Sequence, residues 1–307
     1  MRARYLAKYT KGILIGFILL LLGAGVSQAA VLFLSNAESG TCDTGVASSI
    51  WNYTGSGAGL NARMSYRCDT PVPNSGRSKY FRIDTINLQH DSWNTRDVNR
   101  INLTPGVTYY LGAFFRFDRI LGLDVWRDTN QPDSYDKLFE FDGNIRWIIL
   151  AGWPNGGYTG SYDHKFTFDL YSSPGTCDSC GDNEKKANVA PYNSSNPFLA
   201  DYEKWYAVVM AYTPSSGGSA TNGKVELFIN GIKTTSLSQK TQDASSPYIE
   251  SFQYSGTTAQ PGYDAPAHRR KMDYFIFSNS LTDIQNAGLM SDPEAGAPNA
   301  PTNLRVE

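Results

Sequence analysis

The stretch from Lys204 to Leu237, KWYAVVMAYTPSSGGSATNGKVELFINGIKTTSL, decides the fold. Between Trp205 and Tyr212, apolar and aromatic residues fall on both faces of an extended chain, which is typical of a strand buried in the middle of a sheet. In Lys224–Asn230, apolar and polar residues alternate, which predicts a half-exposed strand. Asn230-Gly231 predicts a tight hairpin turn, because that turn needs positive φ at both central residues. The stretch therefore predicts an antiparallel β-sandwich.

Strand-like segments recur along the rest of the chain, separated by turn clusters rich in Gly, Pro, Asn and Ser. Only Leu281–Met290 has helical spacing, and it is short. About ten or more strands, without repeats or long helices, predict two stacked antiparallel sheets in an all-β sandwich. The expected strands outside the opening stretch are Val31–Glu38, Ser78–Asp84, Asp97–Leu103, Tyr109–Phe117, Lys137–Phe141, Arg146–Leu150, His164–Tyr171, Ile249–Tyr254 and Met272–Phe277.

The composition excludes some partners and favours others. With 307 residues and 41% hydrophobic content, the chain can bury one substantial core, so one main domain is expected. The 27 basic and 29 acidic residues nearly cancel, which gives no support for nucleic-acid binding. Aromatic residues make up 13% of the chain, and aromatic planes suit the apolar faces of sugar rings, although β-sandwiches use aromatics in any case.

Residues 1–29 have the pattern of a secretory signal peptide. A positive n-region precedes apolar Gly12–Leu22 and the small residues of Ser27-Gln28-Ala29. The apolar run is short for a spanning helix, and an uncleaved anchor is the alternative. We expect a monomer that is secreted, periplasmic or on the cell surface and makes no membrane contact after cleavage. The main β-sandwich domain is expected over 31–292. A linker and tail are expected over 293–307, and this tail resembles the start of a fibronectin type III domain.

Four cysteines allow three disulfide pairings in an oxidising compartment. Cys42 and Cys68 both lie near the mature N-terminus, and Cys177 and Cys180 share a loop sequence, so pairing within each couple is the simplest choice. A redox Cys-x-x-Cys is expected near a βαβ pattern, which the sequence lacks, and a four-cysteine zinc site would require the two couples to converge. We expect two structural disulfides.

Several segments together resemble the concanavalin A-like jelly-roll proteins and, within them, the heparin lyase I-like polysaccharide lyases. Glu203-Lys-Trp-Tyr through Gly231 is similar to their Trp-bearing strand and Gly-Lys hairpin. The resemblance implies an enzyme that cleaves uronic-acid polysaccharide by β-elimination. Such hairpins also occur in laminin G-like modules, so a non-catalytic carbohydrate-binding or adhesion module is the alternative. The other resembling segments are Leu32–Gly40, Thr95–Arg100, Thr108–Phe117 and Lys271–Phe277.

β-Elimination needs a group that neutralises the uronate carboxylate and a residue that acts as base and acid. Arg96 and Arg100 lie four apart and share one face if their segment is a regular strand. The resembling lyases place a catalytic Tyr and basic residues in the loop before the closing strand, which here contains Tyr263 and Arg269. The alternative is that these residues form ordinary ion pairs and a solvated turn. The catalytic candidates are His90, Arg96, Arg100, His164, Tyr263 and Arg269.

Two strands carry candidate substrate-binding residues. Lys165, Asp169 and Tyr171 lie in a polar row on one face of His164–Tyr171, which suits a groove. Glu140 and Asp142 alternate where the resembling lyases tend to carry a Gln-x-His pair, and this departure favours the binding module.

Glu140 and Asp142 also match part of the Glu-x-Asp-x-Glu motif of jelly-roll glucanases. The next residue on the same face is Asn144, so the pattern of a retaining hydrolase is incomplete.

A structural calcium ion is a further expectation. In many jelly rolls the first and last strands lie side by side, and oxygen ligands from both converge on an ion. Glu38 and Asp273 are the matching residues, with a simple surface pair of acids as the alternative.

Overall fold

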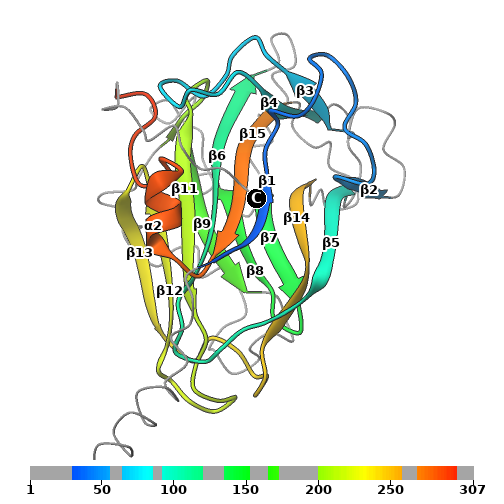
Figure 1. The fold of residues 1–307 in the computed structure, drawn as a ribbon. Helices are drawn as coiled ribbons and strands as arrows, with labels where there is room; N and C mark the ends of the chain where they lie inside the picture. Colours follow the sequence, from blue (N-terminus) through cyan, green and yellow to red (C-terminus); the bar gives the residue numbers. More distant parts are fainter. Residues whose placement is uncertain are drawn as a thin grey trace, which may run out of the picture. The chain divides into compact units, whose positions relative to one another are not determined.

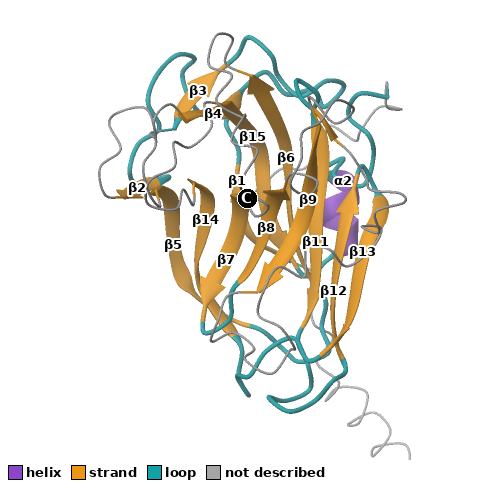
Figure 2. Cartoon of the chain, turned by 180° about the vertical axis from the view of Figure 1, so that it is seen from behind, coloured by secondary structure: helices purple, strands orange, loops and turns teal. Residues whose placement is uncertain are grey.

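In the computed structural model, the described residues are 30–55, 64–85, 92–119, 135–152, 165–172, 200–257 and 268–295. All of them except Ala30 belong to the second of two units, Met1–Ala30 and Val31–Glu307. This second unit consists of two antiparallel sheets, seen from opposite sides in Figures 1 and 2. The predicted all-β sandwich of jelly-roll type is confirmed.

The first sheet has seven strands among the described residues. Its strands pair with their neighbours in antiparallel fashion, and β14 lies between β7 and β5, both far away in sequence. In spatial order the strands are β10 (Ala200–Asp201), β9 (Lys165–Ser172), β8 (Trp147–Gly152), β7 (Tyr135–Gly143), β14 (Tyr248–Thr257), β5 (Ser92–Asn102) and β2 (Asn52–Gly55).

The second sheet has eight strands within the described ranges. The closing strand β15 lies between β6 and β4, and the opening strand β1 (Val31–Ser35) pairs with its C-terminal half. The remaining order is β13 (Ile232–Gln239), β12 (Gly223–Ile229), β11 (Tyr206–Thr213), β6 (Tyr109–Arg119), β15 (His268–Ser278), β4 (Tyr80–Thr85) and β3 (Ser65–Arg67).

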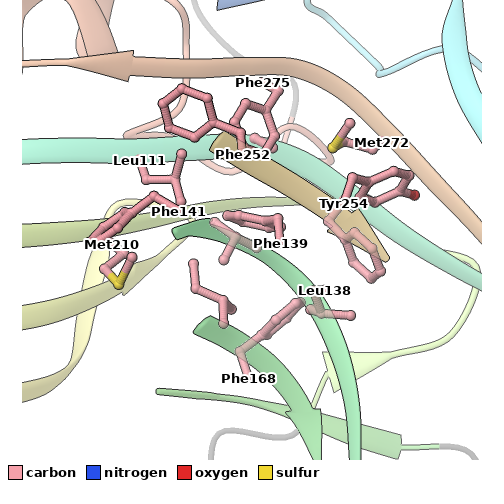
Figure 3. Close-up of a cluster of buried hydrophobic side chains, with 14 of the residues drawn as sticks. Leu111, Leu138, Phe139, Phe141, Phe168, Met210, Phe252, Tyr254, Met272 and Phe275 are labelled. Atoms are coloured by element: carbon pink, nitrogen blue, oxygen red, sulfur yellow. The ribbon is translucent and has the colours of Figure 1, made fainter. Parts of the chain in front are cut away.

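Aromatic side chains from both sheets form the core between them (Figure 3). Phe139 of β7 meets Phe275 of β15 edge to face, with ring centroids 5.8 Å apart. Phe141 and Tyr212 repeat this geometry at 5.4 Å. Each fully buried side chain of this size contributes about 1.5–3 kcal/mol through burial, so these contacts hold the two sheets together.

The fold-deciding stretch forms the elements that its pattern predicts. The first seven residues of β11, 206–212, are all buried. Its even-numbered residues face the core between the sheets, and Ala207 and Val209 join a second apolar cluster that includes Ile284 of α2 (Leu281–Asn286). Asn230 and Gly231 have φ of 52° and 76°, as the hairpin turn requires.

Several boundaries differ from the prediction. The first strand ends at Ser35 rather than Glu38, and the helix ends at Asn286 rather than Met290. The helix stops because the chain reaches Gly288, whose φ of 78° is left-handed. Within the described ranges, no helix has the length and hydropathy of a membrane span.

The disulfide between Cys42 and Cys68 is confirmed, and it links the segment after β1 to the end of β3. The other predicted pair, Cys177 and Cys180, lies outside the described residues.

Candidate functional site

The outer face of the seven-stranded sheet carries the candidate site. On β7, Phe139 and Phe141 point into the core, so the alternating Glu140 and Asp142 face outward. Arg146, just before β8, lies within ion-pair distance of both carboxylates. The prediction that Glu140 and Asp142 share one face agrees with this contact.

Strand register aligns six residues across this face, one from each of six neighbouring strands. Adjacent strands lie about 4.8 Å apart, so the six residues extend over roughly 24 Å. All but one of them are polar residues, and two of them, Ile148 and Glu140, are buried. This cross-strand row consists of Tyr171, Ile148, Glu140, Gln253, Thr95 and Asn52.

Glu140 and Arg146 form a nearly buried ion pair at the middle of the row. The Nε and Nη2 atoms of Arg146 donate to Oε1 of Glu140 at 3.0 and 2.6 Å. The side chain of Glu140 is 1% exposed and that of Arg146 is 23% exposed. Charge-assisted hydrogen bonds of this kind fix a guanidinium firmly. Glu140 therefore orients Arg146, which is the more exposed member of the pair.

Asp142 and Gln253 form a second polar contact beside this pair. Nε2 of Gln253 donates to Oδ2 of Asp142 at 3.2 Å, and Oδ1 of Asp142 accepts from the backbone N–H of Gly143 at 2.9 Å. The amide oxygen of Gln253 is buried and has no hydrogen-bond donor among the described residues. Gln253 thus holds Asp142 in place next to Arg146.

The side chain of Asn144 does not extend the outward-facing row of Glu140 and Asp142; it hydrogen-bonds to the backbone near the start of β14. Its Nδ2 donates to the Ser246 carbonyl at 3.0 Å, and its Oδ1 accepts from the Tyr248 N–H at 2.7 Å. The amide therefore ties the turn after β7 to the start of β14. The motif of a retaining glucanase stays incomplete at this strand.

The predicted binding residues on β9 have positions consistent with the same face. Lys165, Asp169 and Tyr171 alternate in sequence with Phe166 and Phe168, which are buried in the core. Tyr171 pairs with Ile148, the neighbour of Glu140 in the cross-strand row. The side chains of Lys165, Asp169 and Tyr171 lie outside the described set.

The structure does not bring Arg96 and Arg100 together. Ile249 and Phe252 of β14 both face the core, and their partners on β5 are Ile101 and Arg96, five residues apart. Five is an odd number, so the irregularity inverts the alternation between them. The shared face that a regular strand would give Arg96 and Arg100 is therefore lost.

The arginine candidates contact different parts of the molecule. Arg96 donates from Nη1 to the Ser49 carbonyl. The guanidinium of Arg100 lies 3.5 Å from the ring centroid of Tyr248. Arg269 is on β15, in the other sheet. The remaining catalytic candidates His90, His164 and Tyr263 lie outside the described residues, so their roles stay predictions.

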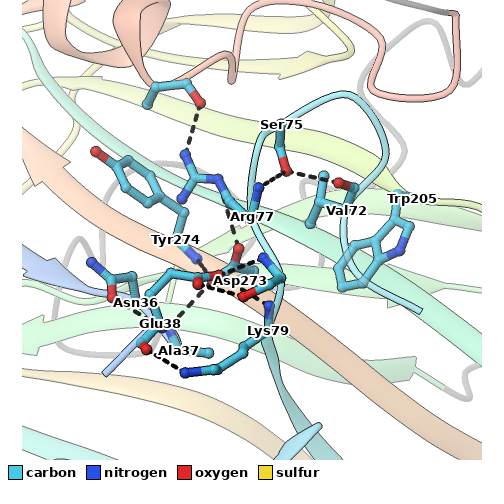
Figure 4. A network of polar contacts seen from close by, with 12 residues as sticks. Asn36, Ala37, Glu38, Val72, Ser75, Arg77, Lys79, Trp205, Asp273 and Tyr274 are labelled. Atoms are coloured by element: carbon cyan, nitrogen blue, oxygen red, sulfur yellow. Dashed lines mark hydrogen bonds and ion pairs between the residues drawn. The ribbon is translucent and has the colours of Figure 1, made fainter. Parts of the chain in front are cut away.

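The predicted calcium ligands Glu38 and Asp273 lie near the paired strands β1 and β15, as expected (Figure 4). Asp273 is fully buried, and burial raises its pKa to about 6, with the guanidinium of Arg77 opposing the rise. Burial alone would also raise the pKa of Glu38, but hydrogen bonds from Ser78 and Lys79 outweigh it, so that pKa is lowered. Both carboxylates face N–H groups and cations of the protein, a donor set that does not fit Ca²⁺.

Sequence reasoning missed Arg146 and Gln253 as parts of the site. The sequence pattern predicts Arg146 only as the first residue of the strand Arg146–Leu150, whereas in the structure the turn at 143–146 folds it back toward Glu140. Gln253 occupies an outward position between core residues Phe252 and Tyr254. Alternation along the predicted strand Ile249–Tyr254 was the available signal for Gln253.

No family model and no curated protein matches the sequence. Among solved structures, alginate lyase Aly36B has a TM-score of 0.45 at 14% identity, covering 66% of this chain and 80% of that one. The endo-β-1,4-glucuronan lyase from Trichoderma reesei has 0.43 at 12%, covering 86% and 99%. A carbohydrate esterase from bacteriophage phi24B has 0.45 at 9%, covering 81% and 98%. Similarity at this level assigns neither a family nor an activity to this chain.

Proposed function

We propose that this chain is a secreted polysaccharide lyase that cleaves uronic-acid polysaccharide on the outer face of the seven-stranded sheet. The observation that carries the proposal is the Glu140–Arg146 pair in the middle of the cross-strand row. The sequence resemblance to heparin lyase I-like enzymes supports the reaction type. The signal-like residues 1–29 and the Cys42–Cys68 disulfide support an oxidising compartment.

Arg146 has the chemistry that the first step of β-elimination requires. A base removes the proton from C5 of the uronate, and the electron pair of that C–H bond moves onto the adjacent carboxylate. A guanidinium beside the carboxylate stabilises this negative charge. Glu140 keeps Arg146 oriented before substrate arrives, which reduces the cost of reorganisation during the step.

The second step releases the leaving sugar. The C4–O4 bond breaks, a double bond forms between C4 and C5, and O4 leaves with a proton from a general acid. The base and acid are proposed among His90, His164 and Tyr263, which lie outside the described residues. Asp142 lies beside Arg146 and can accept hydrogen bonds from sugar hydroxyls.

The alternative function is a non-catalytic carbohydrate-binding module. Two observations favour it: Glu140 and Asp142 occupy the strand where a Gln-x-His pair was expected, and Arg96, Arg100 and Arg269 do not converge. A binding face needs only the cross-strand row, and it needs no base.

An activity screen separates the two functions. The protein is incubated with mannuronate, guluronate and glucuronate polymers and with neutral glucans, and the ultraviolet absorbance of the C4–C5 unsaturated product is followed. A lyase produces this absorbance on a uronate polymer and on none of the glucans. Sugar binding without new absorbance on any polymer would support the module instead.

Substitution of Arg146 tests whether the activity belongs to the proposed site. Arg146→Gln should lower kcat/KM by about 100-fold, because the developing charge loses its guanidinium. Arg67→Gln is the matched control, since Arg67 forms an ion pair with Asp43 at β3 of the other sheet. Full activity in Arg146→Gln would place the chemistry elsewhere.

A further inference from the structure

The contact between the first and last strands depends on a buried carboxylate. Asp273 on β15 is completely buried, close to where β1 pairs with that strand. Its Oδ1 accepts from the backbone N–H of Tyr274 at 2.7 Å and from that of Ala37 at 3.4 Å. Asp273 thereby joins the residues just after β1 to β15. A buried carboxylate at such a junction needs a compensating positive charge.

Arg77 supplies that charge. Its Nε lies 3.7 Å from Oδ2 of Asp273, and neither atom has a hydrogen-bond partner in the described part of the chain. The guanidinium lies 3.5 Å from the ring centroid of Tyr274, and Nη2 donates to the Ala287 carbonyl at 3.2 Å. The ring and this hydrogen bond hold the cation against the carboxylate (Figure 4).

Glu38 is engaged by the same segment of chain. Its carboxylate accepts from the N–H and hydroxyl of Ser78, each at 2.8 Å, and from the N–H of Lys79 at 3.0 Å. Nζ of Lys79 donates to the carbonyls of Glu38 and Gly40 at 2.6 and 2.8 Å. Residues 77–79 thus engage both carboxylates: Ser78 and Lys79 donate hydrogen bonds to Glu38, and Arg77 forms an ion pair with Asp273.

This donor set differs from that of a calcium site. Ca²⁺ takes about six to eight oxygen ligands. Here Oδ1 of Asp273 accepts two backbone N–H groups, its Oδ2 faces Arg77, and Glu38 accepts three donors. A divalent cation would have to displace these donors and would be repelled by two fixed positive side chains.

We propose that Arg77 replaces a structural metal ion at the junction of β1 and β15. The guanidinium neutralises Asp273, while residues 77–79 hold the segment after β1 against the eight-stranded sheet. The junction is therefore independent of divalent metal. This inference does not depend on the proposed lyase activity, because the contacts belong to the other sheet.

Thermal unfolding of the full chain tests the proposal. The wild-type midpoint should stay within about 1 °C in excess EDTA and in millimolar Ca²⁺, whereas Arg77→Met should lower it by roughly 5–10 °C because Asp273 is left uncompensated. Arg67→Met is the control: its surface pair with Asp43 should cost no more than about 2 °C.

A double variant distinguishes a paired cation from a residue that only packs. Arg77→Met in an Asp273→Asn background should cost less than half of what it costs in the wild type, because the carboxylate that needs Arg77 is gone. A wild-type midpoint that falls by several degrees in EDTA, or rises by several degrees in Ca²⁺, would overturn the proposal. Equal costs of Arg77→Met in both backgrounds would also overturn it. If Arg77→Met does not fold, the wild-type EDTA and Ca²⁺ measurements decide alone.

Discussion

At the scale of single residues, Glu140 is important for the proposed site although its side chain is buried. It is almost inaccessible, and it holds Arg146 through two hydrogen bonds to one carboxylate oxygen. An arginine without this partner samples other rotamers and pays entropy when it meets a substrate. Glu140 therefore acts as a positioning residue and not as a contact.

Glu140→Gln should raise KM for a uronate polymer by about tenfold, because a charge-assisted hydrogen bond is replaced by a weaker neutral one. The affinity for a neutral oligosaccharide should change little. Glu226→Gln is the matched control, because Glu226 pairs with Lys224 and Lys233 in the other sheet. A Glu140→Gln variant that weakens neutral and acidic sugars equally would indicate a purely structural role.

The residues of the site were only partly predictable from the sequence. Alternation along a strand was sufficient to place Glu140 and Asp142 on one face. The position of Arg146 depends on how the turn at 143–146 folds, and strand periodicity contains no information about that. The predicted shared face of Arg96 and Arg100 was wrong for a related reason. A bulge inverts the alternation along β5, and this bulge arises from pairing with β14.

At the scale of elements, the turn between β12 and β13 requires glycine at position 231. Gly231 has φ of 76°, and a Cβ built there would lie 2.2 Å from the Met290 carbonyl oxygen. Gly231→Ala should lower the free energy of unfolding by about 1–3 kcal/mol, through backbone strain and this clash. Urea unfolding monitored by tryptophan fluorescence measures the change.

Gly217→Ala is the control for that substitution. A Cβ at Gly217 would meet no atom within 4 Å, and Gly217 is not among the glycines with positive φ. Its effect should stay within about 0.5 kcal/mol. Equal stability of the two variants would contradict the assigned turn.

The elements themselves were largely predictable, because each long strand has a clear apolar pattern. Short strands such as β2 and β3 escaped prediction, since three or four residues carry too little periodicity. The end of β1 was also misplaced. After Ser35 the chain turns toward Asp273, a contact between residues more than 230 positions apart that no local pattern contains.

At the scale of the whole molecule, several tyrosines are buried in the sandwich. Burial raises the pKa of Tyr206 to about 12, and it also raises the pKa values of Tyr80, Tyr212 and Tyr254. In the unfolded chain these hydroxyls ionise near pH 10. Their contribution to stability is therefore complete below pH 10 and is lost as the pH rises through the folded-state values.

The fold should consequently unfold cooperatively in alkali, with tyrosinate absorbance and loss of the circular dichroism signal appearing together. Tyr254→Phe should shift this transition to higher pH, because its buried hydroxyl has no hydrogen-bond partner among the described residues. Tyrosinate formation near pH 10 with unchanged circular dichroism would contradict the burial.

At the scale of the whole molecule, the order in which strands pair could not be predicted from the sequence. Periodicity identifies a strand and its buried face, but it does not name the neighbour. The placement of β14 between β7 and β5 creates the cross-strand row, and all three strands are needed to bring Gln253 beside Glu140. The site therefore arises from tertiary pairing, while the fold class follows from local pattern.

The most direct measurement is calorimetric binding of a uronate oligosaccharide and of the same oligosaccharide with its carboxylates reduced to alcohols, each to wild type and to Arg146→Gln. If Arg146 recognises the carboxylate, wild type should prefer the uronate by about tenfold or more, and the variant should lose that preference while binding the reduced sugar unchanged. An equal preference for the uronate in both proteins would contradict the assignment of this face to uronate recognition.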